Sequence, residues 1–280
     1  MVLKLLAAGL SVVVPVLLVR LLWIPAVEAV FHPSVATTSL LRRASIFLGV
    51  LGGYWAHVRY QERRPATELR CQPGRIALGA LSGAGMISIT TVILFASGTY
   101  ELTAYRGPEL ALLGVASLIW VAAFLEEITY RCILFRILEE AWGTSAALWL
   151  QSLVFAAWHL GNVKAQATEM ITTMVAVTLI GAFWTSIYVR TRSLWVVTAH
   201  HAAWNFAIVW TGLPLSGIED WRAVAPIESR YDGPVWLTGG AFGPEGSVLT
   251  LVVVSLGLAV MLRGAKPRRR EIVAHRSSVA

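Results

Sequence analysis

The chain has 280 residues, of which 56% are hydrophobic and only 14% are charged, and its net charge is +7. Soluble domains average about 25% charged residues, so this composition excludes an ordinary soluble protein and is typical of a polytopic membrane protein. The basic residues gather in a few loops, and no soluble basic domain carries them. This argues against a nucleic-acid-binding surface. We expect the chain to contact a lipid bilayer and no nucleic acid.

Eight apolar stretches approach the length of about 20 residues that a transmembrane helix needs. They cover residues 3–23, 39–58, 76–98, 108–131, 144–161, 168–188, 194–212 and 247–263. Backbone groups in lipid must be satisfied within their own segment, so each stretch is expected to be a helix. The predicted fold class is therefore all-α, a polytopic membrane bundle of about eight helices. We interpret the first stretch as an uncleaved span and not as a signal peptide, because it is long and contains Arg20.

The chain divides into four parts on this basis. The first three helices, the next four helices, the longest loop, and the last helix with its basic tail occupy residues 1–107, 108–212, 213–246 and 247–280. The Gly- and Pro-rich stretch TGGAFGPEGS at residues 238–247 predicts turns. They either pack against the mouth of the bundle or form a lid that contacts substrate. Alternate loops are rich in Lys and Arg, and the positive-inside rule then places both termini in the cytoplasm.

The stretch FLEEITYRCILF at residues 124–135 places three ionisable groups in an apolar segment, where each is costly. Glu127 and Arg131 are four residues apart, so they share a helix face in the order that favours an ion pair. Glu126 points about 100° away and has no such partner on its own helix. A free carboxylate in this environment is suited to taking and giving protons near neutral pH. The Glu127–Arg131 pair could alternatively just lock helices together, which would leave Glu126 unexplained.

Two further helices carry polar groups. FAAWH places His159 at the end of the fifth stretch, four residues after Phe155, and HHAAWN places His201 and Asn205 on one face of the seventh. His200 shares its face with Trp204 instead. Taken alone, each motif could serve packing or an interhelical hydrogen bond.

Together the three motifs supply the parts for hydrolysis. A glutamate and a histidine could activate a water, and histidine and asparagine donors could stabilise charge on a carbonyl oxygen. The set Glu126, His159 and His201 could instead hold a zinc ion. Neither the HExxH zinc-protease motif nor the GxSxG serine-hydrolase motif is present in the sequence.

The ordered series EExxxR, FxxxH and HxxxN on successive helices resembles the CPBP family of intramembrane proteases, which includes the type II CAAX prenyl endopeptidases and bacteriocin-processing (Abi-like) proteins. The resemblance covers about residues 108–212. It implies an eight-helix fold with a polar cavity and peptide-bond hydrolysis. It also implies that Glu126 and His159 activate water and that His201 and Asn205 form the oxyanion hole. Glu127, Arg131 and Phe155 would support the site. The substrate would be a peptide or membrane protein, lipidated or not, and the mechanism either metal-dependent or metal-free.

Two other functions use the same residues. Buried Glu, His and Arg also mark proton- or ion-coupled transporters, although repeated halves and broken helices are absent from the pattern. A catalytically idle scaffold could keep the polar site to bind a membrane partner.

One expectation conflicts with these roles. Counted from the predicted cytoplasmic ends, Glu126 and His201 lie about 8 Å and about 11 Å deep, but His159 lies more than about 20 Å deep. Either the fifth helix is tilted or starts later, or the fourth runs deeper.

Overall fold

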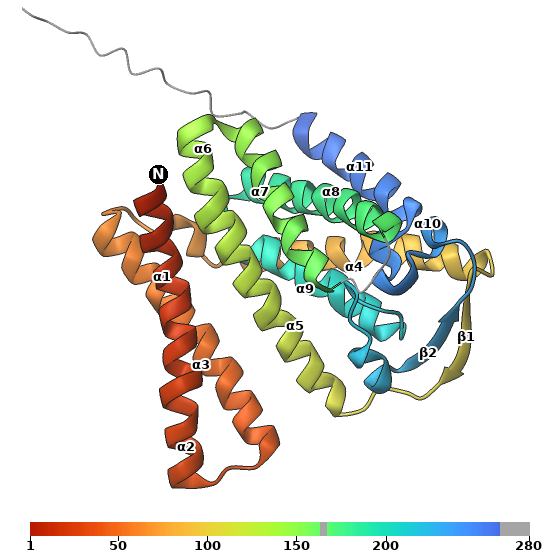
Figure 1. Cartoon of the computed structure of the whole chain (residues 1–280), viewed down its shortest axis with the longest axis horizontal. Helices are drawn as coiled ribbons and strands as arrows, with labels where there is room; N and C mark the ends of the chain where they lie inside the picture. The colour runs from red at the N-terminus through yellow and green to blue at the C-terminus, as the bar shows by residue number, and fades with distance from the viewer. Residues whose placement is uncertain (163–166, 264–280) are drawn as a thin grey trace, which may run out of the picture.

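The computed structural model describes residues 1–162 and 167–263, so the basic tail predicted at residues 264–280 lies outside the described residues. Helices dominate the chain (Figure 1). Their bounds are α1 (Val2–Leu18), η1 (Val19–Trp23), α2 (Ile24–Phe31), α3 (Val35–Ala56), η2 (His57–Gln61), α4 (Pro73–Ala96), α5 (Ala111–Glu127), η4 (Ile128–Phe135), α6 (Arg136–Trp142), α7 (Thr144–His159), α8 (Ala167–Thr191), α9 (Leu194–Trp210) and α11 (Val248–Arg263). The prediction of an all-α bundle is confirmed.

Each predicted apolar stretch corresponds to one long helical segment. Within the described part of the chain, five segments are long and apolar enough to cross a membrane: Val2–Phe31, Val35–Gln61, Pro73–Ala96, Ala111–Trp142 and Met170–Thr191. Many Leu and Val side chains of α1 are exposed. In a membrane protein such side chains contact lipid. Figure 1 shows α1, α2 and α3 along one side of the long α5–α6 segment and α4, α8, α9 and α11 on the other.

The end of the fourth helix was predicted wrongly, at residue 131, and the helix continues to Trp142. Helix α5 continues through the π-helical η4 into α6 and stops only at Gly143, whose φ is 82°. The polar residues after Arg131 suggested a loop, but Arg136 pairs with Glu140 one turn on and with Glu62. Measured from Trp142, Glu126 lies 16 residues or about 24 Å into the helix. His159 lies 15 residues or about 22 Å from Thr144. The longer fourth helix therefore brings Glu126 to the depth of His159.

Helices α4 and α9 pack through a small-residue motif that the sequence-based reading missed. A Cβ atom built on Gly79 would lie 2.6 Å from the Val196 carbonyl oxygen, and one on Gly83 would lie 2.0 Å from that of His200. Such GxxxG spacing lets two helix backbones approach closely. The Ser82 hydroxyl and His200 Nδ1, 2.9 Å apart, add an interhelical hydrogen bond. His200 thus holds α9 against α4, and its neighbour His201 faces the other way.

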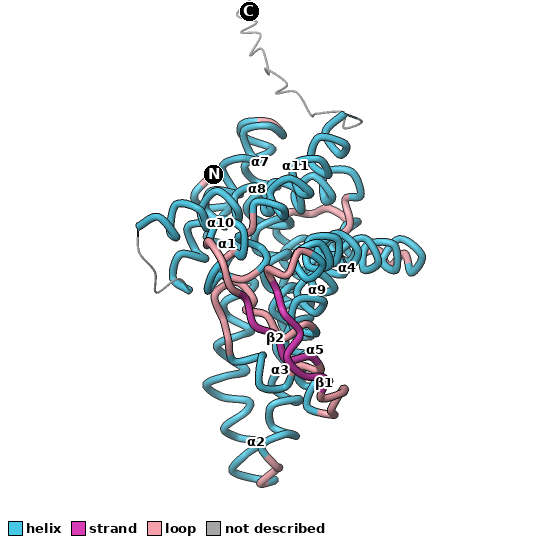
Figure 2. Tube along the Cα trace, turned by 90° about the vertical axis from the view of Figure 1, so that its right-hand side faces the viewer, coloured by secondary structure: helices cyan, strands magenta, loops and turns pink. Residues whose placement is uncertain are grey.

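A two-stranded antiparallel sheet, which was not predicted, joins two of the predicted loops (Figure 2). Strand β1 (Tyr100–Tyr105) pairs with β2 (Ile227–Tyr231), with Tyr100 opposite Tyr231. The Tyr100 hydroxyl donates to the Thr238 carbonyl over 2.6 Å. These contacts anchor the long loop that follows α9.

A buried charged cluster lies at the α6 end of the bundle. Arg64 donates to both oxygens of Glu68, over 2.7 and 2.9 Å, and the Tyr54 hydroxyl donates to the same carboxylate. Burial raises the pKa of Glu68, but the hydrogen bonds from Arg64 and Tyr54 outweigh it, and the pKa lies below its ordinary value of 4.5. Glu68 therefore stabilises the fold as an anion.

Substitution Gly83→Ala is expected to force α4 from α9, because the added methyl group overlaps the His200 carbonyl. The loss should be about 1–3 kcal/mol, typical of overpacking, measured as a lower thermal unfolding midpoint in detergent. Gly85→Ala on the same helix is the control, since its Cβ meets no atom within 4 Å. Equal effects of the two substitutions would contradict the close approach.

Substitution Glu68→Gln should lower stability at neutral pH by about 1.5–3 kcal/mol, the range for hydrogen bonds to charged groups. Because the folded pKa is depressed, the contribution is complete above 4.5 and is lost as the pH falls through the folded value. Unfolding midpoints of the two proteins should therefore converge in acid. Glu101→Gln removes the exposed Arg230 pair and should have no measurable effect. A gap between Glu68→Gln and the unsubstituted protein that stays constant with pH would refute this assignment.

Candidate active site

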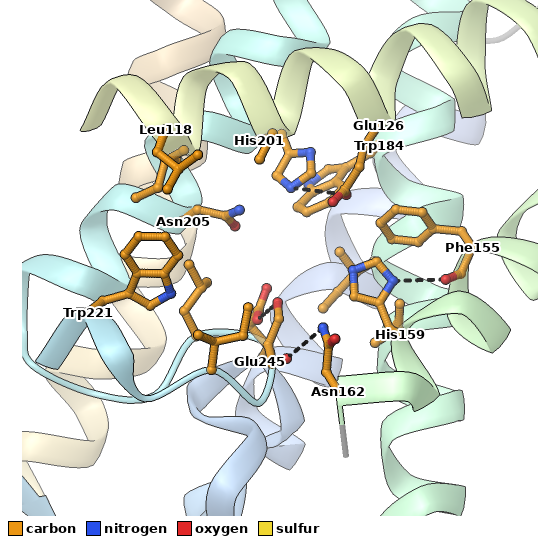
Figure 3. A pocket seen from close by; sticks show the side chains of 17 residues that line it. Leu118, Glu126, Phe155, His159, Asn162, Trp184, His201, Asn205, Trp221 and Glu245 are labelled. Atoms are coloured by element: carbon orange, nitrogen blue, oxygen red, sulfur yellow. Dashed lines mark hydrogen bonds and ion pairs between the residues drawn. The ribbon is translucent and has the colours of Figure 1, made fainter. Parts of the chain in front are cut away.

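A cavity of about 260 Å³ lies among α5, α7, α8, α9 and the loop after α9 (Figure 3). Apolar side chains form much of its wall. Its polar lining consists of Glu126, His159, Asn162, His201, Asn205, Ser216 and Glu245. The structure therefore brings all four residues expected to be catalytic into one cavity, although the sequence places them on three separate helices.

The predicted ion pair beneath the cavity is confirmed. Arg131 Nη1 donates to Glu127 Oε1 over 3.0 Å, and both side chains are completely buried. The guanidinium also donates to the Gly181 carbonyl over 3.2 Å and lies 4.8 Å from the centre of the Phe155 ring. Arg131 thus links η4 to α7 and α8, and it compensates the charge of Glu127.

Glu127 also binds His201, which the sequence did not indicate. His201 Nδ1 donates to Glu127 Oε1 over 2.8 Å, and the imidazole stacks on Trp184 with the ring centroids 3.8 Å apart. These two contacts fix the ring orientation. Nε2 therefore faces the cavity, 3.9 Å from Glu126 Oε2.

Glu126 is more exposed than Glu127 and forms fewer contacts. Its side chain is 30% exposed, whereas that of Glu127 is 0% exposed. Glu126 Oε2 has no hydrogen-bond partner among the residues that the structure describes. The two glutamates thus lie on different faces of the helix, as predicted. Glu127 is bound to Arg131 and His201 in the protein interior, and Glu126 presents a free carboxylate to the cavity.

His159 is oriented by its own helix. Its Nδ1 donates to the Phe155 carbonyl over 2.9 Å, and the ring centres of the two residues are 4.4 Å apart. A neutral imidazole whose Nδ1 carries the proton has an acceptor at Nε2. In Figure 3 the His159 ring lies at the cavity, on the side toward Glu245. Phe155 accordingly sets the tautomer of His159 as well as packing against Arg131.

Asn205 lies one helical turn after His201, and its amide points into the cavity (Figure 3). Its Oδ1 accepts no hydrogen bond from any described residue. The His201 and Asn205 side chains therefore present polar atoms on one wall, as their spacing predicted.

Three functional-site residues escaped the sequence-based reading: Trp184, which stacks on His201, and Glu245 and Trp221 from the loop 213–246. The sequence of an apolar helix does not indicate which of the chain's tryptophans faces a functional site. The Gly- and Pro-rich stretch around Glu245 was noted for its turns, and its single acidic residue was the available clue. The loop contributes both turns and cavity wall, so it packs on the bundle and also faces any substrate.

A zinc ion was one predicted use of Glu126, His159 and His201. Among residues 1–162 and 167–263, no three His, Cys, Asp or Glu side chains form a group that could hold a metal. His201 Nδ1 is bound to Glu127 and His159 Nδ1 to a carbonyl, so Nε2 is the free nitrogen of each ring. Because the described residues form no group of three ligands, no step below involves a metal.

A membrane-spanning helical bundle that encloses acid, imidazole and amide groups defines the class of protein, an integral membrane protein with a polar internal site. Comparison with known families narrows this class. Residues 108–207 match the family model of Rce1-like type II CAAX prenyl endopeptidases. This segment is therefore similar to the CAAX protease family, and that similarity implies a protease. The match does not favour a transporter or an idle scaffold. No curated protein matches the chain.

The two adjacent glutamates should respond differently to substitution. Glu127→Ala leaves Arg131 buried without its counter-charge, which typically costs about 3–5 kcal/mol, and His201 loses its acceptor. Glu126→Ala removes a cavity-facing group and should leave the unfolding midpoint in detergent nearly unchanged. Equal destabilisation by the two substitutions would contradict the division between them.

Proposed function

We propose that this protein is an intramembrane endopeptidase that hydrolyses a peptide bond with a water activated by Glu126 and His159. The observation that carries the proposal is the free Glu126 carboxylate in a cavity whose other polar groups are already oriented. The family match supports proteolysis in general. The glutamate mechanism goes further and rests on the geometry.

Water activation is the first step. A water in the cavity can donate one hydrogen bond to Glu126 and the other to His159 Nε2, the acceptor left by the bond from Nδ1 to Phe155. Glu126 takes the proton as the water oxygen attacks the carbonyl carbon. General-base assistance of this kind contributes about 10²–10⁴-fold to rates.

The charge that develops on the carbonyl oxygen needs donors. Asn205 can donate through its amide, and His201 can donate through Nε2. His201 already donates through Nδ1 to Glu127, so it serves both partners when the ring carries a proton on each nitrogen. The carboxylate oxygens of Glu126 and Glu127 lie 3.9 Å from Nε2 and 2.8 Å from Nδ1 of this ring.

Collapse of the tetrahedral intermediate completes the reaction. The C–N bond breaks, and the proton that Glu126 took from water passes to the leaving nitrogen. Glu126 returns to its carboxylate form, so atoms and charge balance without a further reagent. Glu127 and Arg131 take no proton in this sequence and keep the donors in place.

The substrate is a peptide or protein segment that reaches the cavity from the membrane. Apolar wall residues such as Leu118, Val177 and Ile180 suit an extended apolar segment, with or without an attached lipid. We place the end that carries Lys4, Arg136 and Arg192 in the cytoplasm, because positively charged residues favour that side. Both chain termini then lie in the cytoplasm.

Purified protein in detergent should cleave a quenched peptide that has apolar residues on both sides of the scissile bond. Glu126→Gln and His159→Gln should each lower kcat/KM by about 10²–10⁴-fold. Asn205→Ala should lower kcat by about 10²–10³-fold, as for the loss of one oxyanion donor. Glu126→Gln and Asn205→Ala should unfold at the temperature of the unsubstituted protein, because the affected atoms face the cavity.

Glu109→Gln, at an exposed position two residues before the same helix, is the matched control and should cleave normally. A chelator should leave the rate unchanged, whereas a loss that zinc restores would support the metal alternative. Normal cleavage by Glu126→Gln would refute the assigned role. Ion flux through proteoliposomes without any peptidase activity would favour a transporter.

A further inference from the structure

Glu245 lines the cavity but has no role in the proposed reaction. It lies on a short 3-10 turn, Pro244–Gly246, in the loop before α11 and outside the membrane-spanning segments. The backbone of this turn is tightly packed against neighbouring loop segments. Gly239 and Gly243 have φ of 78° and 91°, and a Cβ on Gly243 would lie 1.9 Å from the Pro214 carbonyl oxygen. The Thr250 hydroxyl donates to the Pro244 carbonyl over 2.6 Å. The backbone of this turn therefore fixes the position of the Glu245 carboxylate.

The Glu245 carboxylate is held by two neutral donors. Ser216 Oγ donates to Oε2 over 2.6 Å, and Trp204 Nε1 donates to Oε1 over 3.1 Å. The residue is only 3% exposed, yet it lines the same cavity as Glu126. No Lys or Arg of the described residues forms an ion pair with it. A buried carboxylate without a cation is costly, and each oxygen retains a lone pair for a further donor.

The described lining of the cavity carries more acidic than basic side chains. Among the residues that the structure describes, this lining holds two carboxylates, Glu126 and Glu245, and neither a lysine nor an arginine. Arg131, the nearest guanidinium behind the wall, is engaged by Glu127 and the Gly181 carbonyl. Figure 3 shows Glu245 across the cavity from Glu126, beside His159. Among the described groups, His159 is the only titratable base on that side, and the proposed reaction uses it as a neutral acceptor.

We propose that Glu245 is a specificity-determining residue that binds a positively charged group of the substrate, an ammonium or guanidinium close to the scissile bond. The inference rests on the proposed function for the identity of the ligand as a peptide. Burial raises the pKa of the Glu245 carboxyl, although the bonds from Ser216 and Trp204 partly offset this. A substrate cation supplies the partner that Glu245 does not find among the described residues, in an apolar setting where charge-assisted hydrogen bonds are strongest.

The same charge disfavours a different substrate. A peptide that places its free terminal carboxylate next to Glu245 would set two like charges together in an apolar cavity, which disfavours binding. The preferred ligand is therefore an apolar segment interrupted by one lysine or arginine, or one that begins with a free amino group at this point.

The test uses a peptide series in detergent that is identical except at one position, moved stepwise along the chain and occupied by lysine, norleucine or glutamate. Norleucine keeps the apolar stem of lysine and removes its charge. At one position, kcat/KM for lysine should exceed that for norleucine by about tenfold or more, the value of a hydrogen bond to a charged group. Glutamate should be the poorest of the three. Glu245→Gln should abolish the lysine preference, so that the variant cleaves the lysine and norleucine peptides with equal kcat/KM.

Ser216→Ala is the matched control. It removes one hydrogen bond to the carboxylate but leaves the charge, so it should retain the preference for lysine even if overall cleavage falls. A preference that is absent in the unsubstituted protein, or that survives in Glu245→Gln, overturns the proposal. The second result would mean that Glu245 serves only to attach the loop to α9.

Binding provides a readout that does not require cleavage. Fluorescent lysine and norleucine peptides can be titrated against Glu126→Gln and against Glu126→Gln/Glu245→Gln. Tighter binding of the lysine peptide to the first protein alone supports the inference, and equal binding of both peptides to both proteins contradicts it. Charge-selective binding without any cleavage by the unsubstituted protein would refute the proposed function and leave the cation site standing.

Discussion

The carboxylate of Glu127 is the interaction on which the site depends. One oxygen accepts from both Arg131 and His201, over 3.0 and 2.8 Å, within the bundle interior. A carboxylate in this position is stable only when it is paired and hydrogen-bonded. The bonds join the fourth helix to α9, and through Arg131 and the Gly181 carbonyl they also reach α8. One buried polar junction thus holds the fourth helix, α8 and α9 together.

This junction explains why two adjacent glutamates have opposite roles. Neighbouring positions on a helix diverge by about 100°, so one points toward the buried junction and the other toward the cavity. The buried residue satisfies a cation and orients an imidazole, whereas Glu126 keeps its carboxylate free. The close approach of α4 and α9 at Gly83 also helps to orient His201, because it fixes the position of the helix on which His201 lies. Orientation and proton transfer are therefore assigned to different side chains.

The sequence predicted whatever depended on local periodicity. Helical spacing alone gave the Glu127–Arg131 pair, the free Glu126 and the common face of His201 and Asn205. It did not give the bond between Glu127 and His201, because that contact joins residues 74 positions apart. The predicted end of the fourth helix was wrong, because a hydropathy pattern does not reveal that Arg136 pairs with Glu62 and Glu140. The two strands and Glu245 depend on the packing of loops from distant parts of the chain, which no local pattern encodes.

The measurement that tests the central claim most directly compares peptide ends in host cells that contain the unsubstituted protein or Glu126→Gln at equal levels. The account predicts a set of new membrane-protein ends that appear only with the unsubstituted protein, and these ends would also identify the substrates. The same ends in cells with Glu126→Gln would contradict the role of Glu126. No difference between the two cell lines, with both proteins folded in the membrane, would contradict proteolysis itself.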